Sequence, residues 1–236
     1  MIQIKHTEGC MICGKELIYS EDAQTHMCFF CKKEFTNNIA CEHGHYICDE
    51  CHRADSDQIL KVILEASSST NPIELAREVM ASPAFQLHGP EHHIMVPLVL
   101  LTTLKNLGVK ITDTQMKNIW LRAKQIPGGS CGIWGACGSA IGTGIALSVL
   151  RGLTPLSKES WGQSNRDTGE ILQYVGAFGG PRCCKRSTYT SLLAAIKIIE
   201  RDKVAVFTEE AHEIPKCRDF WRNKQCLKKE CPYYPR

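Results

Sequence analysis

Residues 28–51 read CFFCKKEFTNNIACEHGHYICDEC, in which cysteines and one histidine recur with the spacing C-x2-C-x9-C-x3-H-x2-C-x2-C. A further C-x2-C pair lies upstream. Two cysteines separated by two residues place both sulfurs on one zinc in a tight turn, whose backbone amides stabilise the thiolates. Three such pairs between residues 10 and 51 therefore predict zinc sites rather than redox dithiols or an iron site. The predicted ligands are Cys10, Cys13, Cys28, Cys31, Cys41, His45, Cys48 and Cys51.

The ligand order from Cys28 onward resembles the first six ligands of a RING finger, and the resemblance implies that the upstream pair completes it. The two sites would then interleave, as Cys28, Cys31, Cys48 and Cys51 on one zinc and Cys10, Cys13, Cys41 and His45 on the other. We favour this order over a sequential zinc ribbon formed by Cys10, Cys13, Cys28 and Cys31. In either order His43 or His52 can replace His45. A RING-like order does not by itself establish ubiquitin-ligase activity.

The zinc module is predicted to be acidic. Residues 1–52 hold four lysines against eight aspartates and glutamates, a net charge of −4. Seven thiolates and one histidine around two zinc ions would bring it to about −7. Such a surface repels a phosphate backbone, so we expect a structural or protein-contacting role for the module rather than nucleic-acid binding. Because it has few aliphatic residues, zinc is also expected to stabilise its fold.

The rest of the chain is long and apolar enough for one helical domain, since 43% of the 236 residues are hydrophobic. With no signal peptide and no apolar run of membrane-spanning length, we expect a cytoplasmic protein that does not contact a membrane. In that reducing compartment, fourteen cysteines favour thiolate–metal bonds over disulfides. The predicted fold is mostly α-helical, in three parts: a two-zinc module over residues 1–55, a helical domain over residues 56–207 and a basic cysteine-bearing unit over residues 208–236.

Apolar periodicity and capping residues predict the helices of the central domain. They fall over residues 57–66, 72–80, 92–106, 113–126, 132–151 and 184–201, with two more helices over residues 155–177. Residues 203–207 (KVAVF) are predicted as a short strand.

A glycine-rich stretch, IPGGSCGIWGACGSAIGTGIALSVL (126–150), carries Cys131 and Cys137. Glycine inside a helix costs about 1 kcal/mol relative to alanine, so five glycines here indicate close helix packing or a bulky group against the backbone. A second turn, GGPRCCKRS (179–187), places Cys183 and Cys184 among basic residues at a helix start. Thiolates at two positive helix ends predict an iron–sulfur site, expected as a 4Fe–4S cluster. A third zinc site or packed thiols are the alternatives.

The layout C…GACGSAIG…CC resembles a family of small presumed redox proteins from anaerobes, over about residues 127–195. Over nearly the full length, CEHGHYICDECH, LHGPEHH, PGGSCGIWGACGSAIG and CPYYP resemble an uncharacterised family of methanogens and other anaerobes. These resemblances imply anaerobic metabolism and supply no activity. Cluster-dependent tRNA thiolases also combine zinc modules with a cluster, but the ATP-binding glycine loop that they need is not found in this sequence.

The segment LHGPEHHIMVP (87–97) places His88, Glu91 and His92 beside an apolar helix. We predict that these three residues handle protons or complete the coordination of a cluster iron; a surface turn capping the helix is the alternative.

The C-terminal spacing C-x8-C-x4-C, formed by Cys217, Cys226 and Cys231, resembles the first three ligands of a CCCH zinc finger. The final histidine is missing, and His212 is the predicted fourth ligand, which gives two or three zinc ions in all. Residues 216–236 carry seven basic against two acidic residues, with four aromatic residues among them, as in single-strand RNA binders. We expect this tail to dock on the helical domain, and at most to contact RNA weakly.

The sequence thus predicts a metalloenzyme that uses an iron–sulfur cluster for redox or sulfur-handling chemistry on a small-molecule or protein substrate. The alternative is a zinc-only adaptor that binds protein or RNA.

Overall fold

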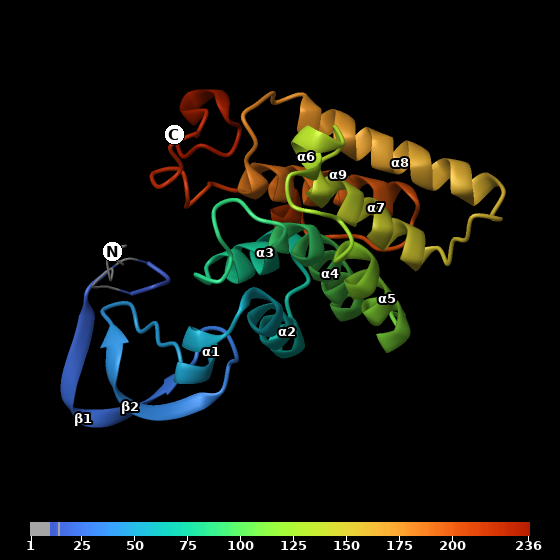
Figure 1. Ribbon diagram of the computed structural model, residues 1–236. Coiled ribbons are helices and arrows are strands. Elements are labelled where there is room, and N and C mark those ends of the chain that lie inside the picture. Colours follow the sequence, from blue (N-terminus) through green and yellow to red (C-terminus); the bar gives the residue numbers. More distant parts are fainter. Residues whose placement is uncertain (1–9, 14) are drawn as a thin grey trace. The chain divides into compact units, whose positions relative to one another are not determined.

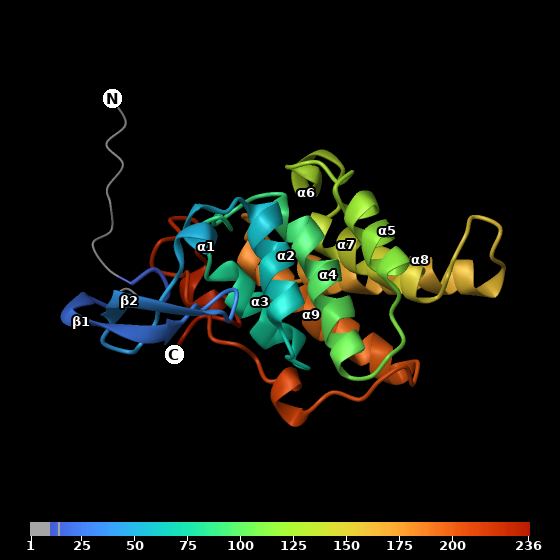
Figure 2. The same ribbon diagram turned by 90° about the horizontal axis from the view of Figure 1, so that it is seen from below.

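The computed structural model describes residues 10–13 and 15–236, and the chain divides into two compact units (Figures 1 and 2). The described residues up to Ser67 form the N-terminal unit together with Glu78–Phe85, and Ser68–Arg77 with Gln86–Arg236 form the helical unit. The residues of helix α3 (Pro72–Met80) are therefore shared between the units. The predicted division into three parts, residues 1–55, 56–207 and 208–236, stays a prediction.

The N-terminal unit contains an antiparallel hairpin that the sequence pattern did not predict. Strand β1 (Leu17–Met27) pairs with β2 (Glu34–Cys41), from Leu17 opposite Cys41 to Met27 opposite Glu34, with an irregularity in the register between Tyr19 and Gln24. Helices α1 (Asp49–Arg53) and α2 (Ser56–Ala66) follow. Helix α2 begins at a capping box in which Asp55 and Gln58 bond reciprocally to each other's backbone amides. The hairpin therefore brings Cys41 back toward the start of β1.

The helical unit is built around α4 (Glu91–Asn106), in which every residue from His92 to Leu104 is buried. A helix that is covered on all sides lies at the centre of its domain. It packs against α5 (Asp113–Ala123), α7 (Gly138–Leu150) and α9 (Cys184–Arg201), and α8 (Glu159–Gly176) packs on α7 and α9. A short helix α6 (Ser130–Ile133) precedes α7, and two 3-10 turns, η1 (Glu209–His212) and η2 (Lys228–Glu230), lie near the C-terminus. The mostly helical fold is confirmed.

Three details of the predicted helices are corrected. The glycine-rich helix does not begin at residue 132, because Gly135 has a left-handed φ of 65° and separates α6 from α7. Residues 155–177 form one helix, α8, instead of two. Residues 203–207 are not a strand, since the Val204 amide donates to the carbonyl of Ile199 and so closes the end of α9.

Close helix packing accounts for the glycines inside α7. A methyl group at Gly142 would lie 2.5 Å from the carbonyl oxygen of His93 on α4, and one at Gly138 would collide with the His93 ring. Gly144 faces Thr168 on α8 in the same way. Gly132, by contrast, has no atom within 4 Å of the position of such a methyl group. Packing is thus the reason for the glycines of α7, whereas Gly132 has open space around it.

None of the helices in the described part of the chain is long and apolar enough to span a membrane.

Candidate metal centres

The first group of ligands lies where the hairpin meets α1. Cys28 follows β1, and Cys48 and Cys51 flank the start of α1. The four sulfurs of Cys28, Cys31, Cys48 and Cys51 lie within 4.8 Å of one another. The Cys31 and Cys48 sulfurs are 3.9 Å apart, close to the spacing of about 3.8 Å that a tetrahedral site with 2.3 Å zinc–sulfur bonds requires. This group can hold one metal ion.

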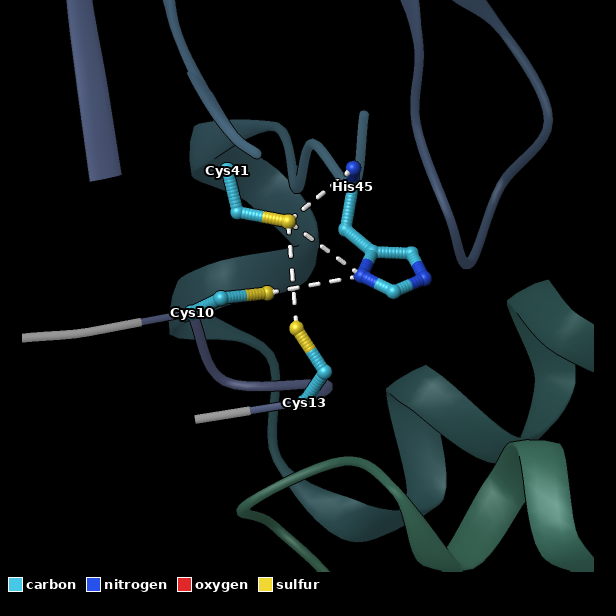
Figure 3. A group of neighbouring side chains, drawn as sticks. All are labelled: Cys10, Cys13, Cys41 and His45. Atoms are coloured by element: carbon cyan, nitrogen blue, oxygen red, sulfur yellow. Dashed lines mark hydrogen bonds between the residues drawn. The ribbon is translucent and has the colours of Figure 1, made fainter. Parts of the chain in front are cut away.

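The second group combines Cys10, Cys13, Cys41 and His45 (Figure 3). The Cys41 sulfur lies 3.8 Å from that of Cys13 and 3.3 Å from His45 Nδ1, which is itself 3.7 Å from the Cys10 sulfur. Figure 3 shows the three sulfurs and Nδ1 turned toward a common centre, with Nε2 pointing away. The group therefore presents four donors to a second ion.

These two groups are the interleaved sets. His45 supplies the nitrogen; His43 is exposed and its Nε2 lies 3.6 Å from Glu42 Oε1, and His52 lies outside both groups. The N-terminal unit thus fits a two-metal module.

Backbone amides favour ionisation of one thiol in each group. Burial opposes ionisation of Cys28, but amide hydrogen bonds, with that of Cys48 the strongest, outweigh it and lower the pKa of this thiol. The amide of His45 has the same effect on Cys41. Burial dominates at Cys10, raising the pKa of its thiol to about 11, and at Cys51, whose pKa is also raised. A bound cation would be needed to ionise all of these thiols together.

Two of the four cysteines predicted as cluster ligands lie at the start of α9, and the predicted cluster stays a prediction. Cys183 caps the N-terminus of α9, where its sulfur accepts a hydrogen bond from the Arg186 amide at 3.5 Å. Cys184, the first residue of α9, is directed instead toward the amide of Gly89. Burial raises the pKa of its thiol to about 11, and the nearby Cys137 raises this pKa further. Cys131 is exposed on α6.

The three residues predicted to handle protons lie at the start of α4. His92 is fully buried, and its Nδ1 lies 3.1 Å from the carbonyl oxygen of Gly89 and 3.4 Å from Glu91 Oε1. Since a carbonyl only accepts, Nδ1 carries the proton. His88 lies in the preceding loop, with both ring nitrogens shielded from solvent. Burial lowers the pKa of both histidines, so their rings are neutral near neutral pH.

At the C-terminus, the tail docks by its aromatic residues. Tyr233 is buried, its hydroxyl lies 2.9 Å from Thr190 Oγ1, and its ring packs on Tyr189 with centroids 5.3 Å apart. The three tail cysteines line one cavity together with a fourth, Cys183. The structure does not bring His212 to this cavity, because its Nε2 lies 3.1 Å from Glu200 Oε1 on α9.

Sequence reasoning missed the meeting of Cys183 with the tail and the contact of Asn223, whose side-chain amide lies 3.7 Å from the Cys183 sulfur. The signals were a three-cysteine motif without a fourth ligand and a Cys–Cys pair with one cysteine to spare. A buried histidine that the pattern did not single out, His93, bonds the carbonyl of Ile126 at 3.3 Å and fits against Gly138.

Fold and donor sets together define a mostly helical protein with an N-terminal two-metal module. The chain belongs to a family of unknown function, DUF5714, whose profile matches residues 59–234. No curated protein and no solved structure matches the chain. The family match includes all seven cysteines from Cys131 onward, whereas the eight N-terminal ligands precede it. The resemblances to redox proteins and to proteins of anaerobes stay predictions.

Proposed function

We propose that the protein is a metalloenzyme of anaerobic metabolism that uses an iron–sulfur cluster for redox or sulfur-handling chemistry, with structural zinc in the N-terminal unit. Its substrate is a small molecule or a protein.

Zinc is the metal that best suits the N-terminal groups. Their donors are seven cysteine sulfurs and one histidine nitrogen in two sets of four, which is the donor chemistry of tetrahedral structural zinc. Both sets are complete, so neither leaves a coordination position for substrate. The two zinc ions therefore stabilise the fold and take no part in the reaction.

The observation that carries the enzyme proposal is the environment of Lys185, the second residue of α9. This lysine is fully buried, directly after the Cys183–Cys184 pair. A buried ammonium group needs negative charge around it. Asp219, Glu91 and the Cys184 thiol, when ionised, favour the charged form of this lysine, and Arg222 opposes it. Burial lowers the pKa of Lys185, so an anionic centre at the start of α9 would favour its charged form.

His88, Glu91 and His92 are the groups proposed to move protons beside this centre. Burial raises the pKa of the Glu91 carboxyl, but His92, the Glu91 backbone amide and Lys185 together outweigh it and lower the pKa below its usual value. Glu91 is thus ionised near neutral pH while both histidines are neutral. Neutral imidazole beside carboxylate can accept a proton from a thiol or a bound substrate. A bound iron–sulfur cluster would supply the electrons that these side chains cannot.

The test is the metal content of the full-length chain, purified and handled without oxygen. The proposal predicts a brown protein that contains iron and acid-labile sulfide in addition to zinc. Colourless protein with zinc alone, also after attempted cluster reconstitution, would contradict it.

The second candidate is a zinc-only adaptor. It is favoured by the apolar side chains that β1 exposes, since Ile18 is 54% and Met27 56% accessible. These two side chains lie near opposite ends of β1, where each can contribute to a protein contact. The charge of residues 1–52 opposes nucleic acid, so the partner of this adaptor would be a protein.

A further inference from the structure

Four cysteines from two distant stretches of the helical unit line one small cavity. Cys183 comes from the start of α9, and Cys217, Cys226 and Cys231 come from the tail. Figure 1 shows the tail (red) folded beside the start of α9. The cavity is also lined by Lys185 and Arg186.

The sulfurs receive the amide hydrogen bonds typical of metal-bound thiolates. The amide of Asp219 lies 3.4 Å from the Cys217 sulfur, and that of Lys228 lies 3.3 Å from the Cys226 sulfur. In both cases the donor is two residues beyond the cysteine. The Ile12 amide makes the same contact with Cys10 in the N-terminal module, at 3.4 Å. Such N–H donors stabilise thiolate charge and tune cysteine-bound metal centres.

The spacing of these sulfurs separates this centre from the N-terminal ones. Among the described residues, groups of three or more ligands within 4.8 Å of one another occur only in the N-terminal unit, so no three of the four cysteines here meet that limit. A single zinc ion requires sulfurs about 3.8 Å apart. In an iron–sulfur cluster each thiolate binds a different iron, and the sulfurs stand farther apart.

Hydrogen bonds hold the tail, and with it three of the cysteines, against α9. The Cys217 amide donates to the Tyr233 carbonyl at 2.7 Å, which closes the tail into a loop. Tyr233 in turn is fixed to Thr190 on α9. The loop is therefore held against the same helix that supplies Cys183.

The charge of the cavity fits the same centre. Four thiolates around an oxidised 4Fe–4S core carry a net charge of about −2. Lys185 and Arg186 are both buried and both line the cavity. Arg186 Nη2 donates to the carbonyls of Gly179 and Pro181, at 2.8 and 3.0 Å, which holds its guanidinium near Cys183. Asp219 also lines the cavity and has the opposite charge, so the two buried cations offset part of the charge of such a cluster.

We infer that Cys183, Cys217, Cys226 and Cys231 together bind one 4Fe–4S cluster. The inference rests on the proposed function for the presence of iron and gives that iron a place. Cys184 stays outside the ligand set. It lies near Cys137 and Glu91, so these three residues can take part in the proposed reaction.

The experiment compares serine variants of the full-length chain under anaerobic conditions, by iron, sulfide and zinc analysis and by absorption of visible light. Cys183→Ser, Cys217→Ser, Cys226→Ser and Cys231→Ser should each lose most of the iron and colour and keep two zinc ions. The matched controls are Cys184→Ser, which alters the neighbouring cysteine, and Cys131→Ser; both should keep the iron.

A measurement on the unmutated chain guards against variants that misfold. Anaerobic alkylation followed by mass spectrometry should find the four cysteines protected after cluster reconstitution and modified in iron-free protein, with Cys131 modified in both.

Three results would overturn the inference. Iron that is lost in Cys131→Ser or Cys184→Ser and retained in the tail variants would move the cluster and leave the proposed function intact. A third zinc that depends on the tail cysteines would make this a zinc site. A wild-type chain that never binds iron would overturn the proposed function as well.

Discussion

The N-terminal unit and the helical unit use cysteine in opposite ways. In the N-terminal unit each of two sets of four donors faces a common centre. The Cys13 and Cys41 sulfurs are 3.8 Å apart in one set, and the Cys31 and Cys48 sulfurs are 3.9 Å apart in the other. Most side chains of the hairpin are exposed. In the helical unit α4 is buried from His92 to Leu104, and cysteines from distant segments line a cavity between packed elements. On the proposed function, metal binding stabilises the fold of the first unit, whereas in the second unit the packed helices and tail bring the cysteines together.

Removal of metal should have the largest effect and should affect the two units differently. A strong zinc chelator should unfold the N-terminal unit, because structural zinc contributes about 10 kcal/mol or more to folding in small zinc modules. The helical unit should stay folded. Hydrogen exchange with peptide resolution in the full-length chain measures both units at once.

Tryptophan fluorescence provides a control, since all four tryptophans, Trp120, Trp134, Trp161 and Trp221, belong to the helical unit. It should change little on chelation of zinc. Retained protection of the β1–β2 amides in metal-free protein would show that the hairpin folds without metal.

An ion-pair network should stabilise the helical unit independently of metal. The buried Asp167 accepts hydrogen bonds from Arg151 and Arg201, both at 2.6 Å. Asp167→Ala leaves both guanidinium groups without this carboxylate and should lower the free energy of unfolding by about 3 kcal/mol. Urea denaturation followed by tryptophan fluorescence checks this, with Asp113→Asn as the exposed control that leaves the midpoint nearly unchanged. Equal midpoints for the two variants would contradict the role of the network.

Close packing of α7 on α4 should cost somewhat less to disturb. Alanine favours a helix over glycine by about 1 kcal/mol, but the added methyl at Gly142 would meet the backbone of α4. Gly142→Ala should therefore lower the free energy of unfolding by about 2 kcal/mol. Gly132→Ala, which has open space, should leave it unchanged or slightly raised. A stabilising Gly142→Ala would mean that α7 lies farther from α4.

The smallest effect concerns pH. Burial raises the pKa of the Asp202 carboxyl, and hydrogen bonds from Arg151 and Arg201 outweigh it and lower the pKa below its usual value. The stabilisation is complete above the unfolded pKa of about 3.9 and is lost as the pH falls through the folded pKa. The stability difference between wild type and Asp202→Asn should hence be constant near neutral pH and shrink below about pH 4. A stability difference that grows on acidification would mean that folding does not lower the pKa of Asp202.

Where ligands are close in sequence, spacing predicted the site. The C-x2-C pairs and the RING-like order gave the two N-terminal sets, because each turn fixes its own sulfurs locally. The hairpin was not predicted, since most residues of β1 are exposed and show no alternation of apolar and polar faces. The meeting of Cys183 with the tail depends on Tyr233 docking against Tyr189 and Thr190, and no local spacing encodes such a contact.

X-ray absorption spectroscopy at the zinc and iron edges of anaerobic full-length protein distinguishes the two kinds of metal centre. We expect zinc coordinated by sulfur and nitrogen in a ratio of seven to one over two ions, from the two N-terminal sets. We expect iron coordinated only by sulfur, with iron neighbours nearby, from the cluster at α9 and the tail. A zinc ratio nearer eleven to one without iron would mean that the tail cysteines and Cys183 bind a third zinc, and would contradict the proposed cluster.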